Sequence, residues 1–189
     1  MKKCAWCLTH PLLETYHDTQ WGVPVFDDKK HFEHLFLETM QAGLSWLTIL
    51  KKYDAFANAF ANFDPSAIAN FTQTRQEKLL QNPGIIRHRQ KISAAVNNAK
   101  RFLALQKECG SFSDFLWNFT DHKIINHKIN DPKNIPAQTA LSEEISKCLK
   151  KQGFAFVGPV TIYAHLQSVG IINDHETSCF RHKKISLPS

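Results

Sequence analysis

The sequence predicts an all-α protein of about nine or ten short helices, and three observations support this fold class. Apolar residues recur three and four positions apart in most segments, which is the spacing of one face of an α-helix. No stretch alternates apolar and polar residues over the length of a β-strand. Pro, Gly and Asp separate the helical segments, and there are no internal repeats. The 189 residues have room for one compact domain, undivided or arranged as two helical lobes.

Composition predicts a soluble, cytoplasmic protein with an anionic partner. Lys and Arg total 23 against 17 Asp and Glu, which gives a net charge of +6 and a pI near 9.1. This balance favours nucleic acid as the partner. Because there is no run of roughly 18 apolar residues and no signal-peptide pattern, we expect no membrane association. The five cysteines are then expected to be free thiols or metal ligands rather than disulfides.

The first thirty residues are too aromatic and too irregular for a disordered tail. They interleave side chains that can ligate a metal with aromatic rings that can stack. Either type alone is ordinary in a protein core, but the mixture within so short a segment predicts a built site. The ligand-type side chains are Cys4, Cys7, His10 and His17, and the aromatic ones are Trp6, Tyr16 and Trp21.

Residues 32–52 are expected to be helical, with an interruption inside the stretch at a tight corner. Asp27 and Asp28 can cap its start. Helical spacing places Glu38 on or beside the buried face, where a carboxylate is costly unless it is paired, hydrogen-bonded or part of a site. The alternative is a surface acid at the edge of the helix. Gly43 interrupts the helical pattern and allows the corner.

The middle of the chain predicts further helices. Residues 53–71 repeat Phe at helical spacing, and this helix is expected to break at Asp64-Pro65, where a new one begins. The next helix is expected to end near Gln81, before the turn at residues 82–84. A long helix follows, with one apolar face over residues 92–103. Its start carries a basic cluster formed by Arg87, His88, Arg89 and Lys91.

The last third continues the helical pattern. Ser113-Asp114 can cap a short helix, and the polar residues 122–139 are expected to form a long surface connection. An amphipathic helix over residues 140–151 precedes Gly158-Pro159 and another helix over residues 160–169. A glycine-cornered hairpin followed by a helix N-terminus presents free N–H groups, which suit a phosphate.

His175 and Cys179 are four positions apart, and on one helical turn they would make half of a metal site. Spacing alone pairs them with Cys4 and Cys7, since structural zinc prefers four Cys and His ligands. A redox role for the two N-terminal cysteines is the other interpretation, although no βαβ pattern supports it.

Seven ordered motifs together resemble the bacterial 3-methyladenine DNA glycosylase I family over nearly the whole chain. They begin near the N-terminus, cross the Glu38 helix and end at the C-terminal His and Cys. The motifs are Cys4-Ala-Trp6, Tyr16-His17-Asp18, Trp21-Gly22-Val23-Pro24, Glu38 with Gln41 to Trp46, Gly84 to Arg89, Phe154 with Phe156-Val157-Gly158, and Asn173-Asp174-His175 with Cys179.

The resemblance implies an all-α helix-hairpin-helix DNA glycosylase fold in which one structural Zn²⁺ joins the N- and C-terminal segments. It replaces the spacing-based ligand set, because His17 takes the place of Cys7, which becomes a spare thiol beside the site. The implied ligands are Cys4, His17, His175 and Cys179.

The implied activity is base-excision repair: a monomer flips 3-methyladenine out of alkylated double-stranded DNA and releases the free base by hydrolysis. An N3-alkylated adenine is cationic, so its glycosidic bond is already weak, and an aromatic pocket between the lobes can hold it. Ionised Glu38 would accept a hydrogen bond from the base and complement its charge. The pocket walls are expected to be Trp6, Tyr16, Trp21 and Trp46.

The duplex is expected to meet the protein at two places. The corner after the Glu38 helix would insert its leucine into the base stack. The Phe156–Pro159 hairpin would hold a backbone phosphate, with a neighbouring lysine adding charge, and the Asn82–Gly84 turn is the alternative hairpin. The residues assigned to DNA contact are Gly43, Leu44, Lys151 and Gly158.

Two positions depart from the family pattern. Many relatives have a tyrosine where this chain has Leu13, so one wall of the pocket is expected to be less polar. The wider superfamily has a catalytic aspartate where this chain has Asn173, with Asp174 next to it. If no strong general base exists, only labile cationic lesions should be excised.

Two other classes of function compete with the glycosylase. A zinc-stapled DNA-binding module without catalysis explains the charge and the ligands, but not an acid among stacking aromatics. A thiol redox protein explains only Cys4 and Cys7.

Overall fold

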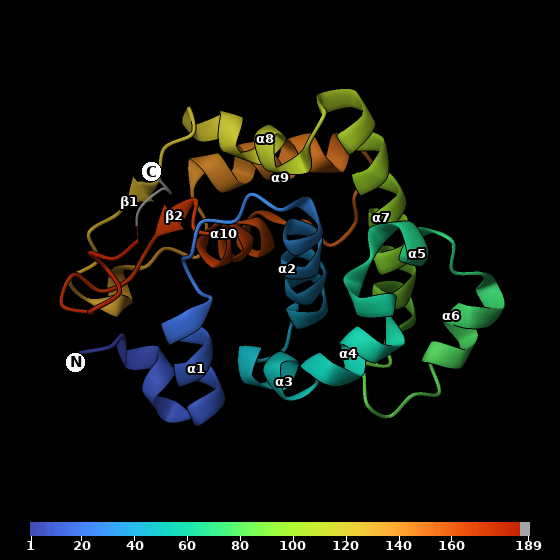
Figure 1. The fold of residues 1–189 in the computed structure, drawn as a ribbon, viewed down its shortest axis with the longest axis horizontal. Coiled ribbons are helices and arrows are strands. Elements are labelled where there is room, and N and C mark those ends of the chain that lie inside the picture. Colours follow the sequence, from blue (N-terminus) through green and yellow to red (C-terminus); the bar gives the residue numbers. More distant parts are fainter. Residues whose placement is uncertain (186–189) are drawn as a thin grey trace.

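The computed structural model describes residues 1–185, and within them ten α-helices and two short strands form the fold (Figure 1). This confirms the all-α prediction. The helices are α1 (Pro11–Thr19), α2 (Asp28–Gln41), α3 (Trp46–Lys51), α4 (Tyr53–Ala59), α5 (Pro65–Ala69), α6 (Gln73–Leu79), α7 (Arg89–Cys109), α8 (Phe112–Trp117), α9 (Ala140–Lys151) and α10 (Pro159–Ser168). The 3₁₀ helices are η1 (Ala5–Thr9), η2 (Ala61–Phe63), η3 (Asn118–Thr120) and η4 (Pro132–Asn134), and the strands are β1 (Ile125–Asn126) and β2 (Ile172–Asn173).

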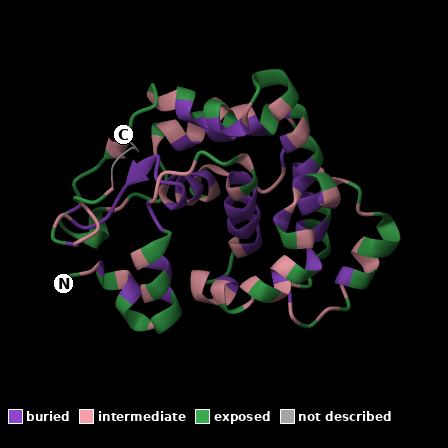
Figure 2. Cartoon of the chain, viewed as in Figure 1, coloured by how far each residue is buried: buried purple, intermediate pink, exposed green. Residues whose placement is uncertain are grey.

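Helix α2 is the centre of the fold. Residues 31–40 of this helix are all buried, and Figure 2 shows α2 buried over most of its length. A helix buried on every side lies in the interior of a protein. Its N-cap is Asp27, whose side chain accepts a hydrogen bond from the Lys30 N–H at 2.8 Å, as predicted. Asp28 accepts hydrogen bonds from the Phe112 and Ser113 N–H groups, which join α2 to α8.

The apolar core surrounds α2 and is largely aromatic. Phe32 and Phe102 make an edge contact at 5.2 Å between ring centroids, and Phe102 stacks on Phe112 at 4.4 Å. These rings come from α2, α7 and α8, so they join α2 to two helices that follow much later in the sequence. The apolar face predicted for residues 92–103 is buried in this core.

The beginning and the end of the described chain lie side by side. The Phe180 N–H donates to the Lys2 carbonyl at 2.9 Å, and the Ala5 N–H donates to Glu176 at 2.6 Å. Strands β1 and β2 pair in parallel beside them, on the left of Figure 1. A second, smaller apolar cluster forms here from Cys4, Tyr16, Trp21 and Cys179.

The structure corrects the predicted helix over residues 53–71. Helix α4 ends at Ala59, before the predicted break at Asp64-Pro65. Ala61, Asn62 and Phe63 have φ of 50°, 51° and 57°, the left-handed region that L-residues rarely adopt. Phe63 is nonetheless 2% exposed, so burial of this ring offsets the backbone cost. Helix α5 then starts at Pro65, capped by Asp64, as predicted.

Two more local predictions were wrong. Ser111, not Ser113, caps α8, since its hydroxyl accepts from the Asp114 N–H at 3.1 Å while the Ser113 N–H is bound to Asp28. His175 and Cys179 do not lie on a helix: residues 174–180 are irregular, with turns and bends. The connection over residues 122–139 is mainly irregular as expected, although it contributes β1 and η4. Among the described residues, no helix is long and apolar enough to cross a membrane.

Candidate active site

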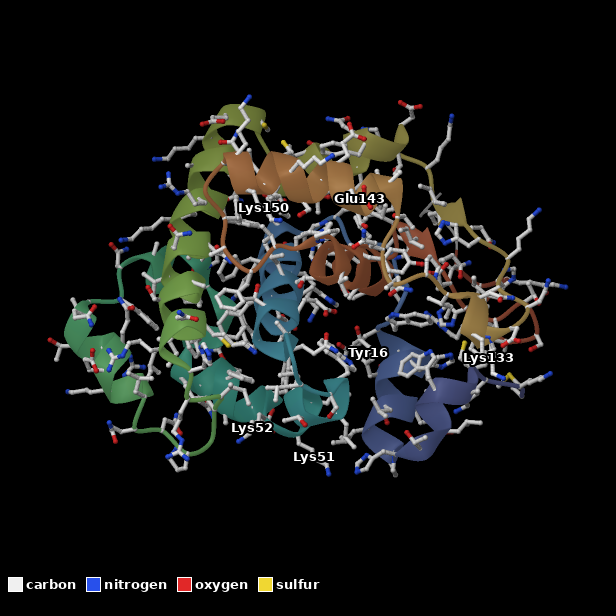
Figure 3. The ribbon with its side chains drawn as sticks, turned by 180° about the vertical axis from the view of Figure 1, so that it is seen from behind. Tyr16, Lys51, Lys52, Lys133, Glu143 and Lys150 are labelled. Carbon is white, nitrogen blue, oxygen red and sulfur yellow. The ribbon has the colours of Figure 1, made fainter. Side chains whose placement is uncertain are left out.

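A cavity of about 320 Å³ lies where the two apolar clusters meet. Figure 3 shows Tyr16 in the space between α1 and the segment formed by α2 and α3. The cavity brings together all four predicted wall residues and the predicted acid. Its lining is Trp6, Tyr16, Trp21, Glu38, Gln41, Trp46, Ile135, Ala164 and Gln167.

The aromatic rings of the cavity brace one another in pairs. Trp6 meets Trp21 edge to face, with 5.0 Å between ring centroids and an interplanar angle of 80°. Tyr16 and Trp46 lie 5.1 Å apart at 52°. Rings held by other rings keep their orientation, so their faces are available to a flat ligand without rearrangement. A cationic ring would gain cation–π attraction in addition to stacking.

Glu38 contributes a buried carboxyl group to this aromatic cavity. The residue is 5% exposed, and its Oε2 atom has no hydrogen-bond partner among the described residues. Nε1 of Trp46, also a lining residue, is buried without a partner as well. Unpartnered buried polar atoms are rare and costly. An acceptor and a donor on the lining of the same cavity therefore indicate a ligand with polar edges.

Burial sets the protonation state of Glu38. It raises the pKa of the carboxyl from its ordinary value of 4.5 to about 8. At neutral pH Glu38 of the free protein is therefore mainly protonated. A cation entering the cavity would favour the carboxylate and displace that proton. A neutral ligand would leave the proton in place.

This raised pKa predicts a pH-dependent difference in stability between the wild type and Glu38→Gln. The folded wild type keeps a proton that the unfolded chain releases above its lower pKa, so its stability falls as pH rises from about 4.5 to about 8. Glutamine does not titrate. We expect the variant to gain on the order of 5 kcal/mol over the wild type between about pH 4 and pH 9. Urea unfolding of both proteins at these two pH values measures the difference, and parallel pH dependences would contradict the assignment.

Four buried ligand-type side chains from both ends of the chain form a cluster that could hold a metal ion. Their ligand atoms all lie within 4.8 Å of one another. Nδ1 of His175 is 3.2 Å from Nε2 of His17 and 3.6 Å from the Cys4 sulfur, and the Cys179 sulfur is 3.4 Å from the His17 nitrogen. Tetrahedral ligation with metal–N of about 2.0 Å and metal–S of about 2.3 Å places ligand atoms about 3.3–3.8 Å apart. The three quoted distances are close to this spacing, so the cluster could hold such an ion.

Outer partners orient both histidines of this metal cluster. Nδ1 of His17 is 2.8 Å from Asp18, and Nε2 of His175 is 3.1 Å from the Trp21 carbonyl. Such contacts fix the ring orientation and leave the other nitrogen for a metal. Cys7 is buried but outside the cluster, with its thiol donating to the Cys4 carbonyl at 3.1 Å. The ligand set expected from the family resemblance is therefore the one that the fold brings together.

The metal cluster also supports the cavity walls. The ring of His175 lies 4.5 Å from that of Trp21, and the ring of His17 lies 5.6 Å from that of Trp6, both edge to face. Two of the four walls thus pack directly against two of the four ligand-type residues. An ion at the cluster would hold the walls as well as the chain ends.

Of the residues assigned to DNA contact, Gly43, Leu44 and Lys151 are exposed, and Gly158 is half-buried. Gly43 has φ of +78°, and the neighbouring Leu44 is 40% exposed. Gly158 is the N-cap of α10, with no side-chain capping bond, and a Cβ atom there would meet nothing within 4 Å. Lys151 is exposed at the end of α9. At the alternative turn, the Gly84 N–H is already bound to the Asn82 side chain at 2.9 Å, which leaves fewer free donors.

The two departures from the family pattern lie outside the cavity. Leu13 is buried in α1, one turn before Tyr16, and does not line the cavity, so the expected less polar wall is absent. Asn173 donates to the His182 carbonyl at 3.0 Å and accepts from the His175 N–H, which gives it a structural role beside the metal cluster.

Asp174 is also held away from the cavity by its partners. It accepts hydrogen bonds from the Tyr163 hydroxyl and from the Gln167 amide at 2.7 Å, and one of its oxygens lies 2.7 Å from His127 Nδ1. Because a carboxylate only accepts, the Gln167 NH₂ must face Asp174, which leaves the amide oxygen of this lining residue free. Asp174 is therefore connected to the cavity by its hydrogen bond to the lining residue Gln167 and does not line it.

Sequence reasoning missed four lining residues, namely Gln41, Ile135, Ala164 and Gln167. Gln41 lies inside a recognised motif. Gln167 is four positions from Tyr163, so helical spacing places the two side chains on one face of α10, and both bind Asp174. Ile135 comes from the connection between η4 and α9, where no local pattern marks a wall residue.

Known proteins resemble this chain in both sequence and fold. The model of the methyladenine glycosylase family covers residues 6–182. The chain is 46% identical over 178 residues to the DNA-3-methyladenine glycosylase of Haemophilus influenzae, covering 94% of this chain and 96% of that protein. A crystal structure of 3-methyladenine DNA glycosylase I superposes with a TM-score of 0.93 at 45% identity, covering 96% of this chain and 100% of that one.

A second solved structure concerns 3-methyladenine recognition by the Staphylococcus aureus 3-methyladenine DNA glycosylase I. It has a TM-score of 0.91 and 38% identity, and covers 95% of this chain and 96% of that one. The similarity in sequence and in fold therefore covers nearly the full length of this chain and of these relatives. The chain belongs to the methyladenine glycosylase family.

Proposed function

We propose that this protein is a DNA glycosylase that flips 3-methyladenine out of alkylated double-stranded DNA and releases it by hydrolysis. The observation that carries the proposal is the unpartnered Glu38 carboxyl in an aromatic cavity of about 320 Å³. The methyladenine-glycosylase relatives support it. Acting as a cytoplasmic monomer, the protein would need no other subunit, since the cavity is complete within one chain.

Recognition of charge explains how the cavity selects its base. A cationic base stacks between the aromatic walls and ionises Glu38, so that an ion pair replaces a protonated acid. Neutral adenine supplies no charge to offset desolvation of the carboxylate, and Glu38 then stays protonated. Charge thereby separates the methylated base from the large excess of normal adenine.

Weak general-base catalysis restricts the substrate to labile lesions. Asp174, the acid nearest to the superfamily's catalytic position, already accepts from Tyr163 and Gln167 and does not line the cavity. The positive charge of N3-methyladenine makes the base a good leaving group, so flipping and binding supply most of what the reaction needs. Uncharged lesions with stronger glycosidic bonds should resist excision.

A structural Zn²⁺ is proposed for the metal cluster. Two thiolates, two imidazoles, full burial and ligand spacing near that of a tetrahedron are the properties of structural zinc sites. The ion would supply a cross-link between chain ends and no chemistry at the base. Its ligands Cys4, His17, His175 and Cys179 lie behind Trp6 and Trp21, outside the cavity lining.

Base release from methylated duplex is the experiment that tests the function. The protein should liberate 3-methyladenine from dimethyl-sulfate-treated duplex and leave unmethylated duplex intact. A DNA-binding module without catalysis would bind the duplex and release nothing. A thiol redox protein would do neither. Base release therefore separates the glycosylase from both other classes, and duplex binding separates those two from each other.

The helix-hairpin-helix role of the α9–α10 connection gives a prediction for Gly158. Its backbone is extended (φ −63°, ψ 161°) and a Cβ has open space, so Gly158→Leu should fold normally. A side chain in front of the free α10 N–H groups would block a phosphate, and losing one such contact should weaken duplex binding about tenfold.

Binding of free 3-methyladenine serves as the internal control for this variant. It should be unchanged, because Gly158 does not line the cavity. Equal loss of duplex and free-base binding would instead place the phosphate contact elsewhere. Gly110→Leu would not be a suitable comparison, because Gly110 has φ of +83° and a side chain there is strained.

A further inference from the structure

Lys91 is a buried cation that reaches from α7 to the end of α2. It lies in the first turn of α7 and is 5% exposed. Its Nζ donates to the Met40 carbonyl at 2.8 Å and to the Ala42 carbonyl at 2.6 Å. A lysine at a helix C-terminus satisfies carbonyls that have no partner within the helix and complements the negative end of the dipole. Lys91 therefore caps the helix that carries Glu38.

The corner beyond α2 has few other constraints. Ala42 leaves the helix with φ of −43° and ψ of 116°, and Gly43 follows with φ of +78°. The Leu44 N–H donates to the Gln41 carbonyl at 2.6 Å. Lys91 thus holds the carbonyls of Met40 and Ala42, and the Leu44 N–H holds the carbonyl of Gln41 between them. Leu44 itself is 40% exposed, so packing does little to hold it in place.

The first turn of α7 also reaches the hairpin before α10. The Lys91 N–H donates to Nδ1 of His88, the N-cap of α7, at 3.3 Å. The His88 ring contacts the Phe156 ring edge to face at 6.5 Å. One helical turn therefore connects the Gly43–Leu44 corner with the segment that leads to Gly158. These are the two places where the duplex is proposed to meet the protein.

We propose that Lys91 is a positioning residue that holds the Gly43–Leu44 corner in the orientation that enters the DNA, an inference that rests on the proposed function. Lys91 belongs neither to the cavity lining nor to the metal cluster. Its loss frees the two carbonyls and lets the corner move, while Glu38 stays held by the buried body of α2. Loss of Lys91 should therefore impair flipping of the base out of the duplex. Binding of the free base in the cavity should be unchanged.

Lys91→Met keeps the length and the apolar stem of the side chain and removes only the ammonium group. Lys100→Met is the matched control, because Lys100 is exposed on the same helix. We expect Lys91→Met to slow single-turnover release from methylated duplex about ten- to a hundredfold, the effect of a misplacement of about 1 Å. Binding of free 3-methyladenine should stay within about twofold of the wild type in both variants.

A double-mutant cycle with Leu44→Ala separates positioning from general destabilisation. If Lys91 acts through Leu44, Lys91→Met should cost little when Leu44 is already alanine. Additive losses in the cycle, or an equal loss of free-base binding, would overturn the inference. If Lys91→Met does not fold, Lys91→Gln retains an uncharged NH₂ donor group, and the same cycle decides.

Failure of this inference and failure of the proposed function give different results. If the wild type is active and the losses of Lys91→Met and Leu44→Ala add in the double variant, only the role of Lys91 is overturned. A wild type that binds duplex but releases no base overturns the proposed function and the inference with it.

Discussion

Replacing Glu38 with glutamine is expected to lower the single-turnover rate of 3-methyladenine release about ten- to a hundredfold. Glutamine has nearly the same shape, so the change removes the ability to ionise when the cationic base enters, while packing around α2 is kept. One charge-assisted hydrogen bond is worth about 1.5–3 kcal/mol, which corresponds to this range. The cationic base would then enter an aromatic cavity with no anion to complement it. Binding of the free base should weaken in parallel.

Glu33→Gln is the matched control for this experiment. Glu33 lies on the same helix and is 9% exposed, but it is bonded to Lys30 and Tyr53 and does not line the cavity. Its substitution should leave the release rate within a few-fold of the wild type. Both variants should retain the metal and the helical content.

The size of the Glu38→Gln effect distinguishes two roles for the carboxyl. General acid–base catalysis typically contributes about 10²–10⁴-fold. A loss far beyond a thousandfold would make Glu38 a catalytic base, contrary to an enzyme that mainly recognises an already activated leaving group. Wild-type rate and affinity would return Glu38 to a buried acid without a role at the site.

Removing the metal is expected to have the largest effect on stability. An ion bound by Cys4, His17, His175 and Cys179 closes a loop of nearly the whole chain, and a covalent cross-link over so long a loop is worth about 4 kcal/mol or more. Ligand bond energy adds to this value. We therefore expect the chelated protein to unfold at much lower temperature. Because Trp21 packs on His175 at 4.5 Å, binding of the free base should fall as well.

Two cysteine variants make this a controlled test. Cys179→Ala should remove the metal, as measured by elemental analysis of protein purified without chelator, and should reproduce the loss of thermal stability. Cys7→Ala should retain one Zn²⁺ per chain, because its buried thiol lies outside the cluster and donates only to the Cys4 carbonyl. Loss of zinc from Cys7→Ala with retention in a His17→Ala variant would contradict the ligand assignment. Protein that carries no tightly bound metal at all would contradict the zinc proposal itself.

The helical architecture could be predicted from the sequence because its signals are local. The period of apolar residues and capping by Asp27 and Asp64 act within a few positions of the chain. The break at residues 61–63 could not be predicted in this way. Its left-handed residues are Ala, Asn and Phe rather than Gly, and only burial of the phenylalanines in the assembled core offsets that conformation.

Local reasoning also reached the candidate site only in part. It found the ligand-type residues and the aromatics near the N-terminus, and it found an acid on an apolar helix. Spacing preferred Cys7 over His17, because the proximity of Cys4 to His17 is created by α1 folding back and not by the sequence separation. The family motifs corrected this choice, since they carry information about the folded chain that spacing lacks.

The sequence by itself determined that the protein is helical, basic and supplied with an acid, four stacking aromatics and thiol and imidazole ligands. Tertiary structure decided that Glu38 is buried, that its Oε2 atom has no partner, and that Ile135 and Gln167 complete its cavity. The physical reason is that burial and hydrogen bonding depend on contacts between segments far apart in the chain. Packing on every side of α2 thus turns an acid that could have lain at a helix edge into one whose pKa is raised to about 8.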